Sequence, residues 1–273
     1  MISVNTNKGA MVALQTLNRT NDQMDKTQNA IATGLKVASA KDNGALFAIA
    51  NKMRSDVGAY DRVRESADRA ASILDTGIAA GESIMELLNE MKGKALAGSQ
   101  AGNSTSAQAA LAADFVQLRD QIASVIANAS FDGANMINAT PSAAVSLGDA
   151  AGGNTITIAG ANLSTGSTII TTIASVLTDA TTSAAALTAT NNSITALGTQ
   201  LATWGAGARR LDVHRTFVGK LQDALNNGIG SIVDADLAKE SAKLQALQVK
   251  QQLGVQALSI ANGSSQTALS LFR

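Results

Sequence analysis

Three acidic side chains near residue 234 are the groups best placed to do chemistry in this sequence. Asp234, Asp236 and Glu240 lie on neighbouring turns of one predicted helix, and carboxylates at this spacing could hold a divalent cation. The same residues suit a helix start, because Asp234 can serve as the N-cap and acidic groups are favourable in a first turn. We favour capping and a solvated face over a metal site. Asp42 indicates a turn at Asn43-Gly44, since the further acids of a calcium loop are absent.

Few other side chains could serve as a nucleophile, a base or a phosphate ligand. His214 is the only histidine, and beside an apolar helical stripe a packed or surface histidine is more common than a base. The absence of cysteine excludes disulfides and thiol chemistry. Neither G-x-S-x-G nor G-x-x-x-x-G-K-[ST] occurs, and no predicted strand precedes the G-x-G of WGAGARR. We therefore predict no enzyme activity, no cofactor and no metal.

The charges balance along the chain, with 21 basic and 21 acidic residues. A net charge of zero gives no field that would attract nucleic acid or an anionic membrane. The arginines near residue 60 could meet phosphates, but acids are interleaved with them, which indicates a salt-bridged polar face: Arg54, Asp56, Asp61, Arg62, Arg64, Glu65, Asp68 and Arg69. No apolar run approaches the roughly 18 residues of a membrane span. MISVNTNKGAMVALQ does not have the pattern of a cleavable signal peptide, so we expect a cytoplasmic protein or one exported by a dedicated machine.

Long helices must carry these side chains, because the chain is rich in alanine and has one proline and 3% aromatic residues. Apolar residues recur with the alternating spacing of four and three that is typical of heptad helices. The rhythm runs through residues 10–35, 53–95, 111–129, 194–225 and 237–268. We expect Gly34 to cap the first helix and a break near Gly230 before the last one. In the last helix, the rows are Leu237, Leu244, Gln251 and Leu258, and Leu247, Gly254, Ala261 and Ala268.

The segment from 141 to 190 differs from the rest, since it is rich in Gly, Ala, Ser and Thr and almost free of charge. ITIAG (156–160) and STIITTI (167–173) are β-branched runs bounded by glycine, and we predict that they pair as a hairpin. The fold class is therefore mainly α, with long heptad helices from both chain ends forming a coiled-coil-like rod around a small β-prone central insert.

The two terminal helices have narrow apolar stripes and polar remainders. An isolated helix of this kind is marginal in water. Pairing the two ends would bury the facing stripes and still leave other apolar side chains uncovered: Val12, Leu253, Val255, Leu269, Leu271 and Phe272. We therefore expect the ends to fold when copies of the chain assemble.

Short motifs at both ends carry a family resemblance. They are VNTN (4–7), LNRTN (17–21), IATGLKVASAKDN (31–43), AIANKMR (48–54) and FDGANMI (131–137), then DADLAKE (234–240), QQLGVQALSIAN (251–262) and LSLFR (269–273). Because all these motifs occur in this order, the sequence resembles bacterial flagellin, the subunit of the flagellar filament, over residues 1–140 and 190–273. The short middle segment is similar to that of alphaproteobacterial flagellins.

The resemblance implies three parts. Residues 1–40 with 234–273 would form an inner-core domain, residues 41–140 with 191–233 a rod-like outer-core domain, and residues 141–190 a short surface insert. The implied inner-core polymerisation interface is Leu14, Leu17, Met24, Ile31, Leu35, Leu237, Leu244, Leu247, Leu258, Leu269, Leu271 and Phe272. The implied outer-core packing residues are Met53, Val57, Leu74, Ile78, Leu88, Phe115, Leu118, Ile122, Leu197, Leu201 and Leu211. The polar stripe residues Asn21, Gln28 and Gln251 would set the register between helices.

The resemblance also implies partners and a location. The chain would be exported through the flagellar type III apparatus and would polymerise outside the cell. It would contact copies of itself, sister flagellins, the hook–filament junction proteins, the filament cap and an export chaperone. Candidate O-glycosylation sites are Thr165, Thr168, Thr171, Thr178 and Thr181. LLNEMKGKALAGS (87–99) lacks the family's arginine-rich innate-immune pattern.

Three alternatives remain open at this point. The first is a hook–filament junction protein, which shares the terminal helices but is present in few copies. The second is a metal- or phosphate-dependent enzyme that uses Asp234, Asp236 and Glu240. The third is a generic coiled-coil scaffold. The full LSLFR and SAKDN motifs favour flagellin itself.

Overall fold

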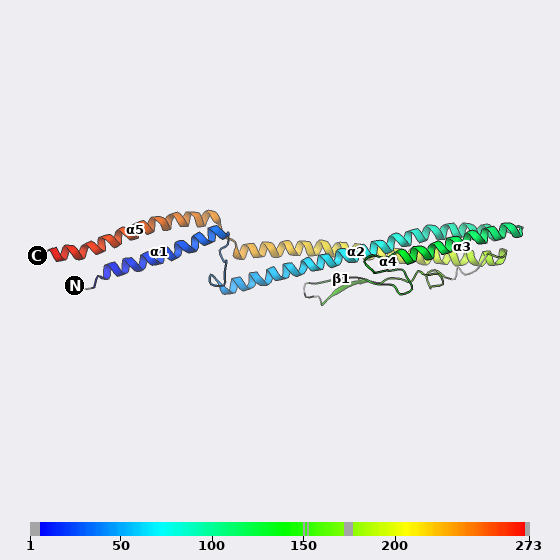
Figure 1. Ribbon diagram of the computed structural model, residues 1–273, viewed down its shortest axis with the longest axis horizontal. Coiled ribbons are helices and arrows are strands. Elements are labelled where there is room, and N and C mark those ends of the chain that lie inside the picture. The colour runs from blue at the N-terminus through cyan, green and yellow to red at the C-terminus, as the bar shows by residue number, and fades with distance from the viewer. Residues whose placement is uncertain (1–5, 150, 152, 172–176, 271–273) are drawn as a thin grey trace. The chain divides into compact units, whose positions relative to one another are not determined.

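The computed structural model describes residues 6–149, 151, 153–171 and 177–270, with the last seven described by their backbone alone (Figure 1). The predicted mainly α class is confirmed. The helices are α1 (Lys8–Thr33), α2 (Gly44–Gly98), α3 (Thr105–Asn128), α4 (Ala180–Val233) and α5 (Leu237–Ser270). The strands are β1 (Ala144–Leu147) and β2 (Thr155–Ile158). The chain divides into two compact units, Met1–Ser55 with Asp223–Arg273, and Asp56–Gln222.

The first unit begins with a capped helix and a tight turn. The Asn7 side chain accepts a hydrogen bond from the Ala10 backbone N–H at 3.0 Å, and Gly34 ends α1 in the left-handed conformation at φ 70°, as predicted. Asp42 then accepts hydrogen bonds from the backbone N–H of Ser39 at 2.9 Å and from its hydroxyl at 3.0 Å. These donors favour the charged carboxylate and lower the pKa of Asp42 below its ordinary value. Asp42 therefore builds the loop that leads into α2.

Asp236 begins α5, and the prediction of Asp234 as the N-cap is wrong. The Asp236 side chain accepts hydrogen bonds from the backbone N–H groups of Ala238 and Lys239, both at 3.1 Å. Asp234 instead lies in a short antiparallel bridge with Leu35. Because this bridge uses extended backbone on both sides, the helix can begin only after it. The predicted break before the last helix is present but lies a few residues after Gly230, since α4 continues to Val233 and α5 begins at Leu237.

The core of the second unit forms where α2, α3 and α4 pack together. Leu74, Leu88, Phe115, Ile122 and Trp204 are buried to within 1% exposure. A glycine makes room for this packing, because a Cβ at residue 81 would lie only 2.8 Å from Leu201 Cδ2. Apolar burial of this extent makes the unit a self-contained folding core.

The insert contains a two-stranded antiparallel sheet, but the predicted pairing is wrong. β2 pairs with β1, with Ala144 opposite Ile158 and Leu147 opposite Thr155. The chain after β2 is fixed elsewhere, since the Ala161 N–H donates to the Met136 carbonyl oxygen at 2.8 Å. Residues 167–171 form bends and an irregular segment, and residues 172–173 of the predicted run lie outside the described residues. Residues 156–158 therefore pair with β1 and not with the predicted run 167–173, although the β1 sequence AVSL has a weak β propensity.

The start of α4 lies inside the segment that the sequence assigned to the insert. The Asp179 side chain accepts a hydrogen bond from the Thr182 N–H at 2.8 Å, and this hydrogen bond lowers the pKa of Asp179. Helix α4 therefore includes residues 180–190. Trp204, further along α4, donates from Nε1 to the Ala159 carbonyl oxygen at 3.0 Å, which fixes the insert on this helix.

Candidate functional site

Helices α1 and α5 lie side by side and run in opposite directions within the first unit (Figure 1). Two side-chain hydrogen bonds fix how they align. Asn7 Nδ2 donates to the Ala261 carbonyl oxygen at 2.6 Å, and Gln251 Nε2 donates to Asn21 Oδ1 at 2.9 Å. These bonds join residues 254 and 230 positions apart in the sequence. The chain thus brings its own two ends together in one helix pair.

The face that α1 turns to α5 is displaced from the predicted one. The most buried residues of α1 are Thr20 at 7% exposure and Thr27 at 1%. Leu17, Met24, Ile31 and Leu35 of the predicted stripe are half-buried. Leu14 is 48% exposed and Gln28 is also exposed. Positions 20 and 27 are therefore the most buried, while of the predicted row 14, 21, 28 only Asn21 is half-buried, in its hydrogen bond with Gln251.

The face that α5 turns to α1 follows the predicted rows. Leu247 is 4% exposed, and Leu244, Gln251, Gly254 and Leu258 are half-buried. Gly254 is at a point of close approach, because a Cβ there would lie 3.3 Å from Leu17 Cδ1. Leu237 is half exposed. The Leu269 side chain and residues Leu271 and Phe272 lie outside the described residues.

Large apolar side chains remain uncovered on this helix pair. Val249, Leu253 and Ile260 are 55%, 58% and 70% exposed, and their spacing of four and seven places them on one face of α5. That face lies opposite the rows that contact α1. Other exposed apolar residues of the pair are Met11, Val12, Leu14, Leu237 and Val255. A surface with so many exposed apolar groups is typical of an interaction site.

The predicted outer-core packing residues mostly contact their own chain. Leu74, Leu88, Phe115, Ile122, Leu197 and Leu211 are buried in the second unit. Val57, Ile78, Leu118 and Leu201 are half-buried there, and Met53 is half-buried in the first unit beside Gly228. These side chains hold the fold, whereas the exposed apolar groups described above are free to contact another molecule.

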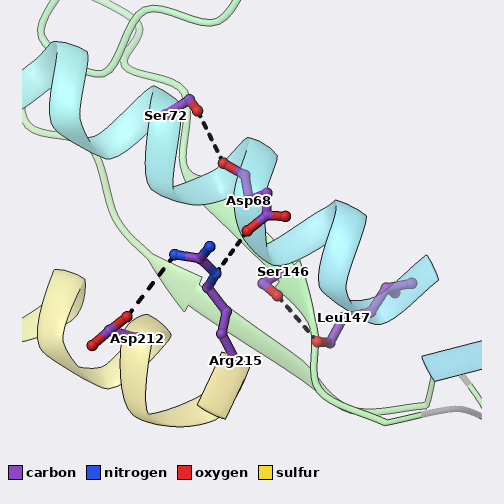
Figure 2. A network of polar contacts seen from close by, with 6 residues as sticks. All are labelled: Asp68, Ser72, Ser146, Leu147, Asp212 and Arg215. Carbon is purple, nitrogen blue, oxygen red and sulfur yellow. Dashed lines mark hydrogen bonds and ion pairs between the residues drawn. The ribbon is translucent and has the colours of Figure 1, made fainter. Parts of the chain in front are cut away.

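The charged cluster near residue 60 stabilises local structure. Arg215 of α4 pairs with Asp68 of α2 at 2.6 Å and lies 3.9 Å from Asp212 (Figure 2). The Leu147 N–H of β1 donates to the Ser66 hydroxyl at 3.0 Å, so the same region joins two helices and a strand. Within the predicted set, Arg62 pairs with Glu65 at 2.8 Å, while Asp68 and Arg69 pair with residues outside it, Arg215 and Asp132.

The groups considered for metal chemistry do not converge. Across the described residues, no three His, Asp or Glu side chains gather in a way that could hold a metal ion. His214 Nε2 is buried and has no hydrogen-bond partner in this part of the chain. Among the helices of the described segments, none is long and apolar enough to cross a membrane.

Known families match both helical regions. The family model for the bacterial flagellin N-terminal helical region matches residues 4–142, and that for the C-terminal helical region matches residues 187–272. The chain belongs to the bacterial flagellin family. It is a structural subunit that polymerises into the flagellar filament for swimming motility, and this family forms the filament outside the cell.

Individual flagellins resemble the chain over its whole length. Flagellin FljK of Caulobacter vibrioides is 47% identical over 99% of this chain and 98% of its own. A flagellin of Brucella melitensis is 37% identical over the full length of both chains. The crystal structure of Bacillus cereus flagellin has a TM-score of 0.51 and 25% identity, and covers 56% of this chain and 88% of that one. These relatives include alphaproteobacterial flagellins and do not favour the junction-protein alternative.

Proposed function

We propose that this flagellin polymerises through the apolar side chains that the α1–α5 pair leaves exposed. The observation that carries the proposal is the row Val249, Leu253 and Ile260 on the face of α5 away from α1. Because these side chains are already partly covered, burying the remainder stabilises by about 3–5 kcal/mol before the cost of association. Covering this row therefore offsets part of that cost, and burial of the other exposed apolar side chains of the pair adds to the gain.

The predicted inner-core residues take two roles in this proposal. Leu17, Met24, Ile31, Leu35, Leu244, Leu247 and Leu258 hold the two helices of one chain together. Leu14 and Leu237, both about half exposed, contact neighbouring copies. We assign Leu269, Leu271 and Phe272 to the same contacts on sequence grounds. We keep the division into inner core, outer core and insert that the resemblance implies, with residues 180–190 joined to the outer core because α4 begins at Ala180.

The function we propose is structural, with no enzyme activity. The chain passes through the flagellar type III export apparatus with an export chaperone, and it meets the junction proteins and the cap at the two ends of the filament. It also co-assembles with sister flagellins, since Caulobacter vibrioides has several related ones. Among the glycosylation candidates, Thr165, Thr168, Thr178 and Thr181 are exposed. Thr171 is half-buried, with its hydroxyl 3.4 Å from that of Ser193, and is the weakest candidate.

Seeded polymerisation tests the proposal. Monomers obtained by heat dissociation are mixed with filament seeds and ammonium sulfate, which strengthens apolar burial. The variant Leu253→Ser/Ile260→Ser should raise the critical concentration at least tenfold. The matched control is Val145→Ser in the insert, since Val145 is also exposed, at 47%, but lies on the proposed solvent side. Equal growth of both variants and the wild type, seen by negative-stain electron microscopy, would contradict the proposal.

A further inference from the structure

An apolar ridge with a basic rim runs along the outer face of α4 in the second unit. Val213 and Phe217 are 69% and 58% exposed, and their spacing of four places them on one face of the helix. Arg209 and Arg210 precede this pair by about one turn, and Lys220 follows it. Within the described residues, none of these three cations has an ion-pair partner.

A shallow groove of small residues lies between α2 and α3 in the same unit. Ala79, Ala80 and Ser83 of α2 form one wall, and Ser124 and Val125 of α3 form the other. These short side chains leave room for a larger apolar group.

An acidic row borders this groove on the α2 side. Asp75, Glu82 and Glu86 are exposed, and at spacings of seven and four they lie along one flank of the helix. In the part of the chain that the structure describes, none of the three has an ion-pair partner. The α2 side of the groove therefore carries exposed acids, and the α4 ridge carries exposed cations.

The two surfaces also agree in length. Arg209 and Lys220 are separated by 11 residues, or about 16 Å along α4, and Asp75 and Glu86 are separated by the same distance along α2. Two apolar side chains lie between the cations, and the small groove residues lie between the acids.

We propose that the α4 ridge of one copy packs into the α2–α3 groove of a neighbouring copy. Phe217 and Val213 fill the groove, while Arg209, Arg210 and Lys220 face Asp75, Glu82 and Glu86. The occupant is a second copy because the chain carries both complementary surfaces. A contact between two different surfaces of identical chains produces an open helical polymer when its rotation does not close a ring. This inference rests on the proposed function and adds a contact distinct from that of the terminal helices.

Charge exchange between copies tests the contact. Two proteins are made, one with Arg209→Glu/Arg210→Glu and one with Glu82→Lys/Glu86→Lys. All four sites are exposed, so circular dichroism should show each protein folded as the wild type. Alone, each places like charges across the contact, and its critical concentration should rise at least tenfold. An equimolar mixture should regain nearly wild-type growth, because copies that alternate restore every opposite-charge pair.

Further measurements separate this contact from nonspecific effects. Asp120→Lys, an exposed acid-to-base change on α3 outside the groove lining, should not rescue the Arg209→Glu/Arg210→Glu protein. Phe217→Ala should also raise the critical concentration, and that effect should persist in high salt while the charge effects weaken. If all variants form filaments at wild-type concentrations, or if the mixture is no better than its components, the ridge–groove contact is overturned. Filament growth in those same experiments would leave the proposed function standing.

Discussion

Thr27→Val should stabilise the α1–α5 pair, although the change deletes a polar group. Thr27 is 1% exposed, and its hydroxyl has no hydrogen-bond partner in the described residues. The other threonines of α1 behave differently. Thr16, Thr20 and Thr33 each donate a hydrogen bond to the backbone carbonyl four residues earlier, at 2.9, 2.9 and 2.7 Å.

The expected gain follows from the cost of that unpaired hydroxyl. Burying a hydroxyl without a partner costs about 1–3 kcal/mol in proteins. Valine has nearly the shape and the helix propensity of threonine, so little else changes at Thr27. We therefore expect the pair to gain about 1–2 kcal/mol. Because we expect the pair to order on assembly, the critical concentration should fall roughly five- to thirtyfold.

The assay is the critical concentration of seeded polymerisation, with the depolymerisation temperature as a second readout. Thr20→Val is the matched control, since Thr20 is buried on the same face, at 7% exposure, but has its hydrogen bond. Because Thr20→Val deletes that hydrogen bond, this variant should stabilise assembly by no more than about 0.5 kcal/mol. A Thr27→Val protein that assembles no better than Thr20→Val would refute the reasoning. In that case the Thr27 hydroxyl has a partner in the filament.

Two further predictions concern the second unit and the Asp42 turn. Gly160→Ala should destabilise the second unit by roughly 2–4 kcal/mol in urea unfolding, because the new Cβ would lie 2.4 Å from a backbone carbonyl oxygen. Gly93→Ala, with open space around its Cβ, should instead stabilise by about 0.5–1 kcal/mol, and equal effects of the two changes would contradict the packing argument. Ser39→Ala should raise the pKa of Asp42 toward its ordinary value in an NMR titration, since one donor to the carboxylate is lost. The lowered pKa of Asp42 stabilises the turn at any pH above the ordinary pKa of an aspartate. This stabilisation is lost as the pH falls through the lowered pKa. Because the variant has less of it to lose, its stability should depend less on acid pH.

Much of the helical architecture could be predicted from spacing alone. On α5, the predicted heptad rows hold the buried Leu247 and the half-buried Leu244 and Leu258, while Val249, Leu253 and Ile260 lie exposed on the opposite face. The Gly34 cap was also predictable, because the left-handed conformation at a helix end favours glycine. Periodicity determines these features, since only one arrangement buries the apolar stripe.

Where two rows or two strands have similar local sequence preferences, the tertiary structure decided which one packs or pairs. On α1, Thr20 and Thr27 are as polar as Asn21 and Gln28, yet the threonines are buried, while Asn21 is half-buried against Gln251 and Gln28 is exposed.

The pairing of β2 was decided in the same way. STIITTI has the stronger β propensity, but AVSL became the partner of β2 because hydrogen bonds from residues 161 and 163 to residues 136 and 137 fix the chain beyond that strand. Sequence by itself determined where the helices lie and that apolar surface would remain exposed. Which face packs, and which strand pairs, depended on backbone hydrogen bonds and side-chain volumes from distant parts of the chain.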